Sequence, residues 1–134
     1  MDPALVVRTL VDAINDCNWV AIGQVLTPGF RRHSLASGAK GLQSVAEIIE
    51  FLKAERSAYP DATEAVLLSF AHDDMVAARH EFRGTQRGWL GAYPPMNRKV
   101  CSCYIALYRI EGDRIDESWA EWDNLADLRQ LGHL

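Results

Sequence analysis

The sequence predicts an α+β fold in which an antiparallel sheet curves around helices that pack on one of its faces. Hydrophobic residues recur at helical spacing in most of the first half, whereas the second half alternates hydrophobic and polar residues as strands do. Short turns separate those alternating segments, which is typical of hairpins and of the α+β pattern. The chain has 134 residues, 49% of them hydrophobic, which predicts a single domain over residues 1–134 with room for one pocket.

The N-terminal segment predicts two helices. Asp2 is a suitable N-cap and Pro3 suits the first helical position, so we expect a helix that runs to Ile14. The polar residues that follow break its hydrophobic pattern. Asn18 can then cap a second, short helix that ends near Pro28.

A short strand, a loop and one long helix are expected next, over residues 30–35, 38–41 and 42–59. Hydrophobic residues at helical spacing mark the last of these segments as a helix with one apolar face. Pro60 ends it, because proline cannot continue a helix.

Four strands and a final helix are predicted in the second half, at residues 63–71, 76–84, 99–110, 114–122 and 124–131. Tight turns at 72–74 and 111–113 join neighbouring strands. Residues 85–98 are rich in glycine and proline and form a long connection. A sheet of these strands, curled around the helices, would enclose a pocket lined by inward side chains.

Charge and composition narrow the function classes. The formal net charge is −4 and no basic run exceeds two residues, so we expect no nucleic-acid partner. No apolar stretch approaches the ~20 residues that cross a bilayer, so no membrane partner is expected either. The N-terminal residues do not resemble a signal peptide, and three cysteines, an odd number, favour reduced thiols and a cytoplasmic location.

Candidate acid/base residues gather on the last predicted strand. Because strand side chains alternate, Glu117, Trp119 and Asp123 are expected on one face, together with Ile115 and Glu121. If that face lines the pocket, burial and neighbouring charges raise the pKa of a carboxyl group into the range of a general acid or base. The alternative is that the acids face water on a convex sheet surface and only Trp119 is buried. Alternation alone leaves both interpretations open.

Several short segments, taken in order, resemble a known family. They are FRRH at 30–33 with Gly41, YPD at 59–61, VAAR at 76–79, GTQRG at 84–88, GAYPP at 91–95, RIEGDRIDESW at 109–119, Asp123, and QLG at 130–132. In this order and spacing, nearly the whole chain resembles the SnoaL-like polyketide cyclase and ester cyclase group of the nuclear transport factor 2-like superfamily. Gln86 and the Met96-Asn97 pair depart from the family pattern, at positions expected on a pocket rim or loop.

The resemblance implies a cone-shaped fold: a strongly curved mixed or antiparallel sheet wrapped around the N-terminal helices, enclosing a deep apolar pocket. It also implies ring closure of a small, largely apolar carbonyl compound by an intramolecular aldol reaction, without a metal or organic cofactor. Position for position, Asp123 resembles the family's general acid/base. His33 stands where the family commonly carries a histidine, and would orient Asp123 or polarise a carbonyl; the alternative is a hydrogen-bonded histidine at a strand edge.

Five residues are candidates for substrate binding: Arg79, Trp119, Glu117, Tyr104 and Trp89. Arg79 resembles a family position that would stabilise an oxyanion, or it pairs with an acid of the sheet. Trp89 in the long connection would cover an apolar ligand, or serve packing or a subunit contact. Tyr104 and Tyr108 share a strand face, from which one hydroxyl would enter the pocket; ordinary core packing is the alternative.

No metal site is expected. Cys101 and Cys103 are two residues apart on one strand, about 7 Å between α-carbons, which suits a disulfide poorly. The histidines are scattered, without the spacing of a zinc site, and the glycines of the long connection do not form a nucleotide-binding fingerprint.

We therefore expect a cofactor-free enzyme of the cyclase or isomerase type that binds a small, apolar, carbonyl-containing ligand, with Asp123 as acid/base. A non-catalytic protein that holds a small hydrophobic ligand is the first alternative. A hydrolase or dehydratase on the same fold is the second, and would require Arg79 to meet two acids in the pocket. Family behaviour implies a homodimer formed through the outer face of the sheet.

Overall fold

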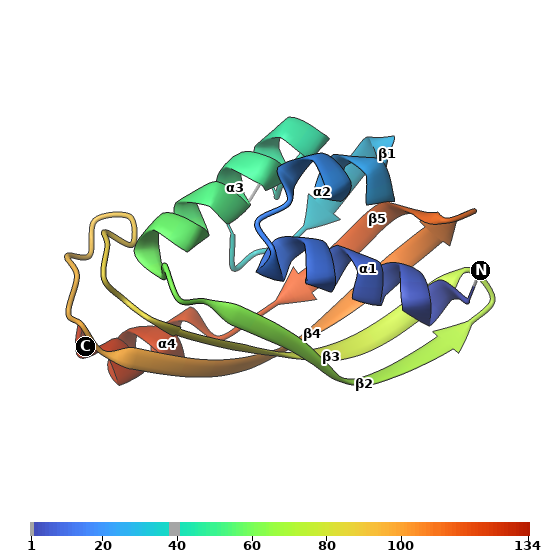
Figure 1. Cartoon of the computed structure of the whole chain (residues 1–134). Helices are drawn as coiled ribbons and strands as arrows, with labels where there is room; N and C mark the ends of the chain where they lie inside the picture. The colour runs from blue at the N-terminus through green and yellow to red at the C-terminus, as the bar shows by residue number, and fades with distance from the viewer. Residues whose placement is uncertain (1, 38–40) are drawn as a thin grey trace.

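The computed structural model describes residues 2–37 and 41–134, so most of the loop expected at 38–41 lies outside the described residues. This part of the chain forms four helices and five strands (Figure 1). The helices are α1 (Pro3–Asn15), α2 (Trp19–Val25), α3 (Val45–Ala58) and α4 (Asn124–Leu131). The strands are β1 (Leu26–His33), β2 (Thr63–His72), β3 (Met75–Thr85), β4 (Lys99–Glu111) and β5 (Arg114–Glu121).

The strands form one mixed sheet in the order β1-β5-β4-β3-β2. β1 pairs with β5 in parallel, and the other neighbours pair antiparallel. Helices α1, α2 and α3 lie over one face of the sheet (Figure 1). Helix α4 lies beside the first residues of β4, where Gln130 is hydrogen-bonded to the backbone of Cys101. The predicted α+β class is confirmed, whereas the strong curvature expected of the sheet is not shown.

Side-chain caps set the helix starts. Asp2 accepts a hydrogen bond from the backbone N–H of Ala4, and Asn18 accepts one from that of Ala21, as the sequence predicted. The long helix begins three residues later than predicted, because Ser44 caps it. The second helix ends early, and β1 begins at Leu26 rather than at residue 30. A proline inside this strand is tolerated because β1 is an edge strand of the sheet.

A β-bulge in β5 decides which side chains face the helices. Ile110 of β4 pairs with Ile115, but the next residue back, Arg109, pairs with Glu117, so Asp116 is an extra residue without a partner on β4. The bulge reverses the alternation along β5. Ile115 therefore lies on the helix-covered face together with Ser118, Ala120 and Trp122, while Glu117, Trp119 and Glu121 lie on the opposite face.

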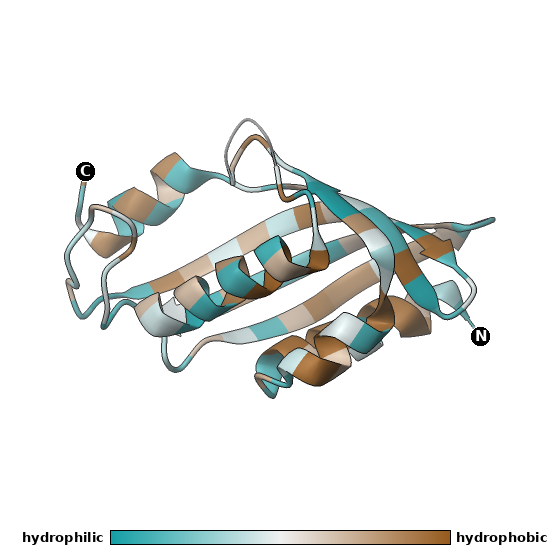
Figure 2. Ribbon diagram, turned by 90° about the horizontal axis from the view of Figure 1, so that it is seen from above, coloured by the Kyte–Doolittle hydropathy of each residue, from teal (hydrophilic) through white to brown (hydrophobic). Residues whose placement is uncertain are grey.

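The core lies between the helices and this inner face. Its fully buried members include Val6 of α1, Ile22 of α2 and Ile115 of β5. Figure 2 shows α1 as mainly hydrophobic, whereas α3 carries alternating hydrophilic and hydrophobic bands, as expected of a helix with one face toward the core. None of the helices in the described ranges has the length and apolar sequence that a membrane-spanning helix needs.

Candidate active site

A cavity of about 620 Å³ lies between α1, α3 and the inner face of the sheet. Most of its lining is aliphatic or aromatic, including Phe51, Phe82, Trp89 and Trp122. A few polar side chains interrupt this lining, and four of them, Arg32, Glu55, Glu64 and Asp127, carry a carboxyl or guanidinium group. Apolar cavities with a few convergent polar groups are the usual form of small-molecule sites.

Glu64 is fixed in the cavity by an unusual backbone contact. It lies on the edge strand β2, and the side-chain amide of Asn15 at the end of α1 holds its backbone from outside the sheet. Asn15 accepts from the Glu64 N–H at 2.8 Å and donates to the Glu64 carbonyl at 2.8 Å. The Glu64 side chain is only 8% exposed. Burial, reinforced by the charge of Glu55, raises its pKa to about 8.

Glu55 brings a second carboxyl group to the same cavity from α3. Burial raises its pKa to about 7, against the opposing effect of the positive charges of Arg32 and Arg56. Because the charge of Glu55 helps to raise the pKa of Glu64, Glu55 loses its proton first and Glu64 follows, both near neutral pH. A pair of this kind holds both a proton acceptor and a proton donor available at pH 7.

Arg32 of β1 carries the positive charge of the cavity. Its Cζ lies 4.5 Å from the ring centroid of Phe51 and 5.4 Å from that of Trp122, so the guanidinium packs against two aromatic rings. Its Nε and Nη2 are buried and donate to no atom within the described residues. Burial lowers its pKa, but a guanidinium stays protonated in proteins. The cavity therefore holds a fixed cation that is incompletely hydrogen-bonded.

A short polar chain continues from Glu64 into the sheet. His80 of β3 is fully buried, and its Nδ1 lies 3.8 Å from Oε1 of Glu64. Its Nε2 lies 2.9 Å from the hydroxyl of Tyr108, and its ring stacks on Tyr104 at 4.6 Å between centroids. Burial lowers the pKa of His80 to about 4 and raises that of Tyr108, so both stay neutral at pH 7. These neutral groups support Glu64 without adding charge beside it.

These groups can carry out proton transfer at carbon. A carboxylate accepts a proton from a carbon atom next to a carbonyl, and a nearby cation stabilises the enolate oxygen that results. The aromatic lining limits access of water, which strengthens both effects.

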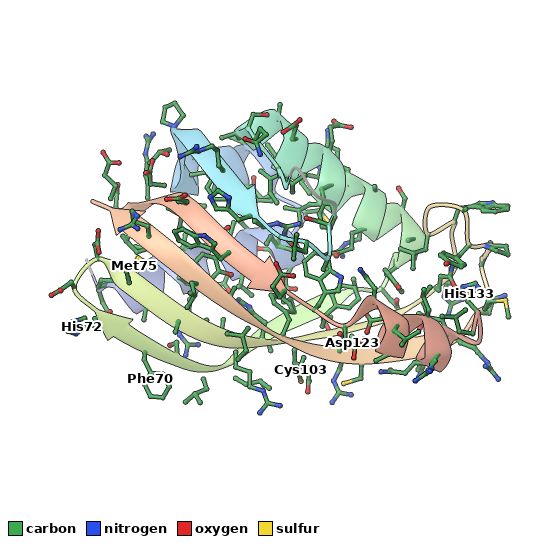
Figure 3. All side chains as sticks on the ribbon, turned by 180° about the vertical axis from the view of Figure 1, so that it is seen from behind. Phe70, His72, Met75, Cys103, Asp123 and His133 are labelled. Atoms are coloured by element: carbon green, nitrogen blue, oxygen red, sulfur yellow. The ribbon has the colours of Figure 1, made fainter. Side chains whose placement is uncertain are left out.

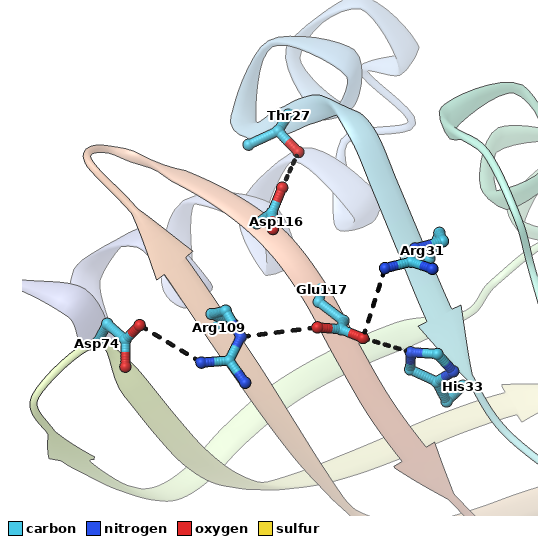
Figure 4. Close-up of polar contacts among 7 residues, drawn as sticks. All are labelled: Thr27, Arg31, His33, Asp74, Arg109, Asp116 and Glu117. Carbon is cyan, nitrogen blue, oxygen red and sulfur yellow. Dashed lines mark hydrogen bonds and ion pairs between the residues drawn. The ribbon is translucent and has the colours of Figure 1, made fainter.

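The acids predicted on β5 lie outside this cavity, on the opposite face of the sheet. Glu117 contacts His33 at 2.6 Å, and Arg109 and Arg31 at 3.6 and 4.0 Å (Figure 4). The ring of Trp119 stacks on His33 there. The hydrogen bond from His33 and the two arginine charges lower the pKa of Glu117, opposite to the expected direction.

The expectation that Glu117 and Trp119 line the pocket is therefore wrong, and its cause is the bulge at Asp116. His33, on the edge strand β1, is also outside the cavity lining, and it matches the alternative of a hydrogen-bonded histidine at a strand edge. Plain alternation from Ile115, which is buried, carries the next odd-numbered residues to the same face. The extra residue shifts the phase and sends them outward. Within the cluster of Figure 4, Asp116 itself accepts a hydrogen bond from the hydroxyl of Thr27 at 2.7 Å.

Asp123 is also outside the cavity lining. It is exposed, at the start of α4 (Figure 3), where its Oδ1 accepts from the backbone N–H of Ala126 at 2.9 Å. This is the geometry of an N-cap, for which aspartate is one of the preferred residues. The expectation of a secluded Asp123 is wrong, because its side chain is exposed and caps α4.

The other predicted ligand-binding residues divide between the two faces. Arg79 is exposed on the outer face of β3, so it meets no pair of acids in the cavity and the expectation that it binds substrate is wrong. Tyr104 and Trp89 line the cavity, Tyr104 from β4 and Trp89 from the connection between β3 and β4. Trp89 is 64% exposed, which puts it at a cavity opening rather than in the interior.

The three cysteines of the chain, Cys17, Cys101 and Cys103, are all free. In the two described ranges, no group of three or more His, Cys, Asp or Glu side chains is arranged to hold a metal ion.

Comparison with known proteins assigns the family. The model of the SnoaL-like polyketide cyclase family matches residues 4–131, nearly the whole chain. This chain belongs to the SnoaL-like polyketide cyclase family. Its resemblance to that group, noted from short segments, is thereby confirmed. No curated protein matches the sequence.

Several solved structures share the fold of this chain. IdmH of Streptomyces antibioticus, proposed to be a polyketide cyclase, is 24% identical, with a TM-score of 0.87 over 98% of this chain and 99% of its own. A protein of Acidithiobacillus ferrooxidans with the same proposed activity is 20% identical, with a TM-score of 0.87 over 99% of this chain and 96% of its own. AclR of Streptomyces galilaeus, proposed to be a hydroxylase, is 21% identical, with a TM-score of 0.85 over 99% and 97%. At these identities the likeness concerns the fold alone.

Proposed function

We propose that this chain catalyses cofactor-independent proton transfer on a small, largely apolar carbonyl compound, leading to aldol-type ring closure or isomerisation. The observation that supports this most directly is the joint burial of Glu64, Glu55 and Arg32 in one apolar cavity. Glu64 replaces Asp123 in the role of acid/base, because it is buried and its pKa lies near neutrality.

The reaction needs no redox partner. The ionised carboxylate of Glu64 takes a proton from a carbon flanked by carbonyls, and the electron pair of the broken C–H bond becomes the enolate. Arg32 stabilises the negative oxygen. The enolate carbon then attacks a second carbonyl carbon of the same molecule, and the alkoxide formed takes the proton back from the carboxyl group. The carboxylate of Glu64 is regenerated, so the cycle is balanced.

The first step is measurable without the natural substrate. The probe is ethyl 2-methyl-3-oxo-3-phenylpropanoate, an aryl β-keto ester with one hydrogen between two carbonyl groups. Its exchange for deuterium in D₂O buffer is followed by NMR. We expect the native chain to accelerate exchange above buffer, with a rate that rises between pH 6 and 9 as Glu55 and Glu64 ionise.

A matched pair of variants tests the assignment of the base. Glu64→Gln preserves shape and removes the carboxylate, so the catalysed exchange should fall at least ~100-fold, the usual contribution of general base catalysis. Glu117→Gln changes the same residue type on the outer face and should leave the rate within about twofold. Equal exchange by Glu64→Gln and the native chain would refute the role of Glu64. Tight binding of the probe without exchange by the native chain would instead support the non-catalytic ligand-binding alternative.

We also propose that a second copy of the chain covers the outer face of β2, β3 and β4. Large apolar side chains are exposed there, among them Leu68, Phe70 and Ile105, which are 52%, 67% and 56% exposed. Figure 3 shows Phe70 and Cys103 on this side of the sheet. Light scattering should give twice the chain mass, and Phe70→Lys should give a monomer. A monomeric native chain at micromolar concentration would contradict the proposal.

A further inference from the structure

The cavity carries a positive charge without a matching negative partner. No carboxylate oxygen lies within 4.0 Å of a guanidinium nitrogen of Arg32 in residues 2–37 and 41–134, although other arginines of the chain form such pairs. The residues outside these ranges, Met1, Gly38, Ala39 and Lys40, have no carboxylate side chain. The chain itself therefore offers Arg32 no close ion pair.

The surrounding titratable groups leave this charge largely uncompensated at neutral pH. Those that feel or flank it are Glu55, Glu64, Tyr108 and Glu121. At pH 7 Glu64 is mostly protonated and Tyr108 is neutral, since burial raises both pKa values. Glu121 lies on the exposed face, where its Oε1 accepts from the backbone N–H of Leu35 at 2.9 Å. Inside the cavity Glu55, with a pKa of about 7, supplies a partial negative charge. Asp127 also lines the cavity, and burial raises the pKa of its carboxyl group, but it is not among the groups whose charge acts on Arg32.

Burying an ionised group without a partner is unfavourable, and Arg32 cannot lose its proton to avoid this. Its packing against Phe51 and Trp122 also restricts how far it can turn toward water. A site held in this state is complementary to an incoming anion. The planar guanidinium favours a planar group with two oxygens, a carboxylate, which forms paired hydrogen bonds with it.

The rest of the cavity lining indicates the chemical nature of the remainder of the ligand, beyond its carboxylate. Phe51, Phe82, Tyr104 and Trp122 present aromatic surface around the cavity, and Trp89 adds another indole at its opening. Aromatic side chains stack well on flat conjugated ligands. A single positive charge in this setting matches a ligand that carries one negative charge when it binds.

We propose that the ligand of this cavity is a flat aromatic or conjugated monocarboxylic acid whose carboxylate binds Arg32. This inference rests on the proposed function, since it describes the substrate of the same cavity. The carboxylate anchors the molecule at Nε and Nη2 of Arg32, its reactive carbon lies toward Glu64, and Nη1 of Arg32 is left to stabilise the enolate oxygen that forms there. This binding mode also gives Glu55 a role. Its negative charge, when it is ionised, weakens the attraction between Arg32 and the bound carboxylate.

The test compares two probes of equal shape, 2-naphthoate and 2-naphthamide, by titration calorimetry at pH 7. The native chain should bind the acid at least ~10-fold more tightly than the amide. In Arg32→Met this preference should vanish while the amide still binds, which would show that the cavity is intact. Arg31→Met, the neighbouring arginine on the outer face, should keep the preference.

A second arm needs no variant. From pH 6 to pH 9 Glu55 and Glu64 lose their protons, so two negative charges appear beside the bound carboxylate. The affinity for 2-naphthoate, which is ionised throughout this range, should fall ~10-fold or more, and that for the amide should stay constant. His80 remains neutral across this range because its pKa is about 4.

Equal affinity for acid and amide overturns the inference, as does an acid preference that survives Arg32→Met. So does the absence of binding by either probe up to its solubility limit. The outcome is separate from that of the exchange assay. A chain that prefers the acid but exchanges no deuterium contradicts only the proposed function, whereas exchange without acid preference contradicts only this inference.

Discussion

The two faces of the sheet treat the same residue type in opposite ways. On the inner face, Glu64 is dehydrated, has no ion pair within hydrogen-bonding distance, and its pKa rises to about 8. On the outer face, Glu117 is bound by His33 and flanked by two arginines, and its pKa falls. The charge of Glu117 on the outer face is compensated by hydrogen bonding and ion pairs, so this cluster is less suited to binding a ligand or transferring a proton. The inner cluster is unsatisfied, and this makes it suitable for binding and proton transfer.

Removing the bulge should have the largest effect on this contrast. Deletion of Asp116 would restore plain alternation and exchange the two faces of β5 on one side of the deletion. Charged groups would then enter the core, so we expect a loss of more than ~4 kcal/mol of unfolding free energy, or no cooperative transition. Asp116→Ala removes only the hydrogen bond to Thr27 and should cost about 1 kcal/mol. Urea denaturation measures both, and a deletion variant as stable as Asp116→Ala would contradict this account of the two faces.

The pH dependence of stability should have opposite sign on the two faces. Glu64 has a raised pKa in the folded chain, so its contribution is present below pH 4.5 and is lost as the pH rises toward 8. Glu64→Gln should match the native chain near pH 4.5 and exceed its stability at pH 9 by on the order of 3 kcal/mol.

Glu117 has a lowered pKa, so its stabilising contribution is present above the ordinary glutamate pKa of 4.5 and is lost as the pH falls through the pKa of the folded chain. Glu117→Gln should therefore be less stable than the native chain at pH 7, and the difference should close in acid. Thermal unfolding across pH 3 to 9 measures both variants. Parallel curves for the two variants would contradict the assigned environments.

A smaller effect is expected from the contact that positions Glu64. Asn15→Ala removes two hydrogen bonds to the Glu64 backbone and should cost about 1–2 kcal/mol of unfolding free energy. If Asn15 is a positioning residue, exchange of the keto ester should slow about tenfold and its pH–rate profile should shift. Asn18→Ala is the matched control, since it removes a helix cap and leaves Glu64 untouched. Loss of stability without a shifted profile would give Asn15 a purely structural role.

The smallest effect is expected at Asp123, the residue that the sequence placed in the catalytic role. Asparagine caps a helix about as well as aspartate, so Asp123→Asn should change unfolding free energy by less than ~0.5 kcal/mol. Exchange of the keto ester should remain within about twofold of the native rate. A large loss of exchange would return Asp123 to the acid/base role.

Much of the fold could be predicted from the sequence because it depends on local signals. Asp2 and Asn18 cap the helices where expected, and hydrophobic periodicity located most strands. The candidate site was missed because the bulge has no recognisable signal in the sequence. Asp116, the extra residue, could equally be an ordinary polar residue of a regular strand. Arg32 was within reach, since it is two residues from Phe30, which is 2% exposed, and so shares its face. Glu64 gave a weaker signal, because the contact that positions it comes from Asn15 of α1, which is 49 residues away in the sequence.

The amide of Asn15 has one more consequence, which concerns association of the chain rather than catalysis. β2 is a free edge of the sheet, and such edges accept further strands from other molecules. At Glu64 the outward N–H and carbonyl are already occupied by Asn15, so an added strand could not pair past this point without detaching α1. The pair of hydrogen bonds from Asn15 that positions the carboxyl group of Glu64 thus also limits the addition of further strands at the edge formed by β2.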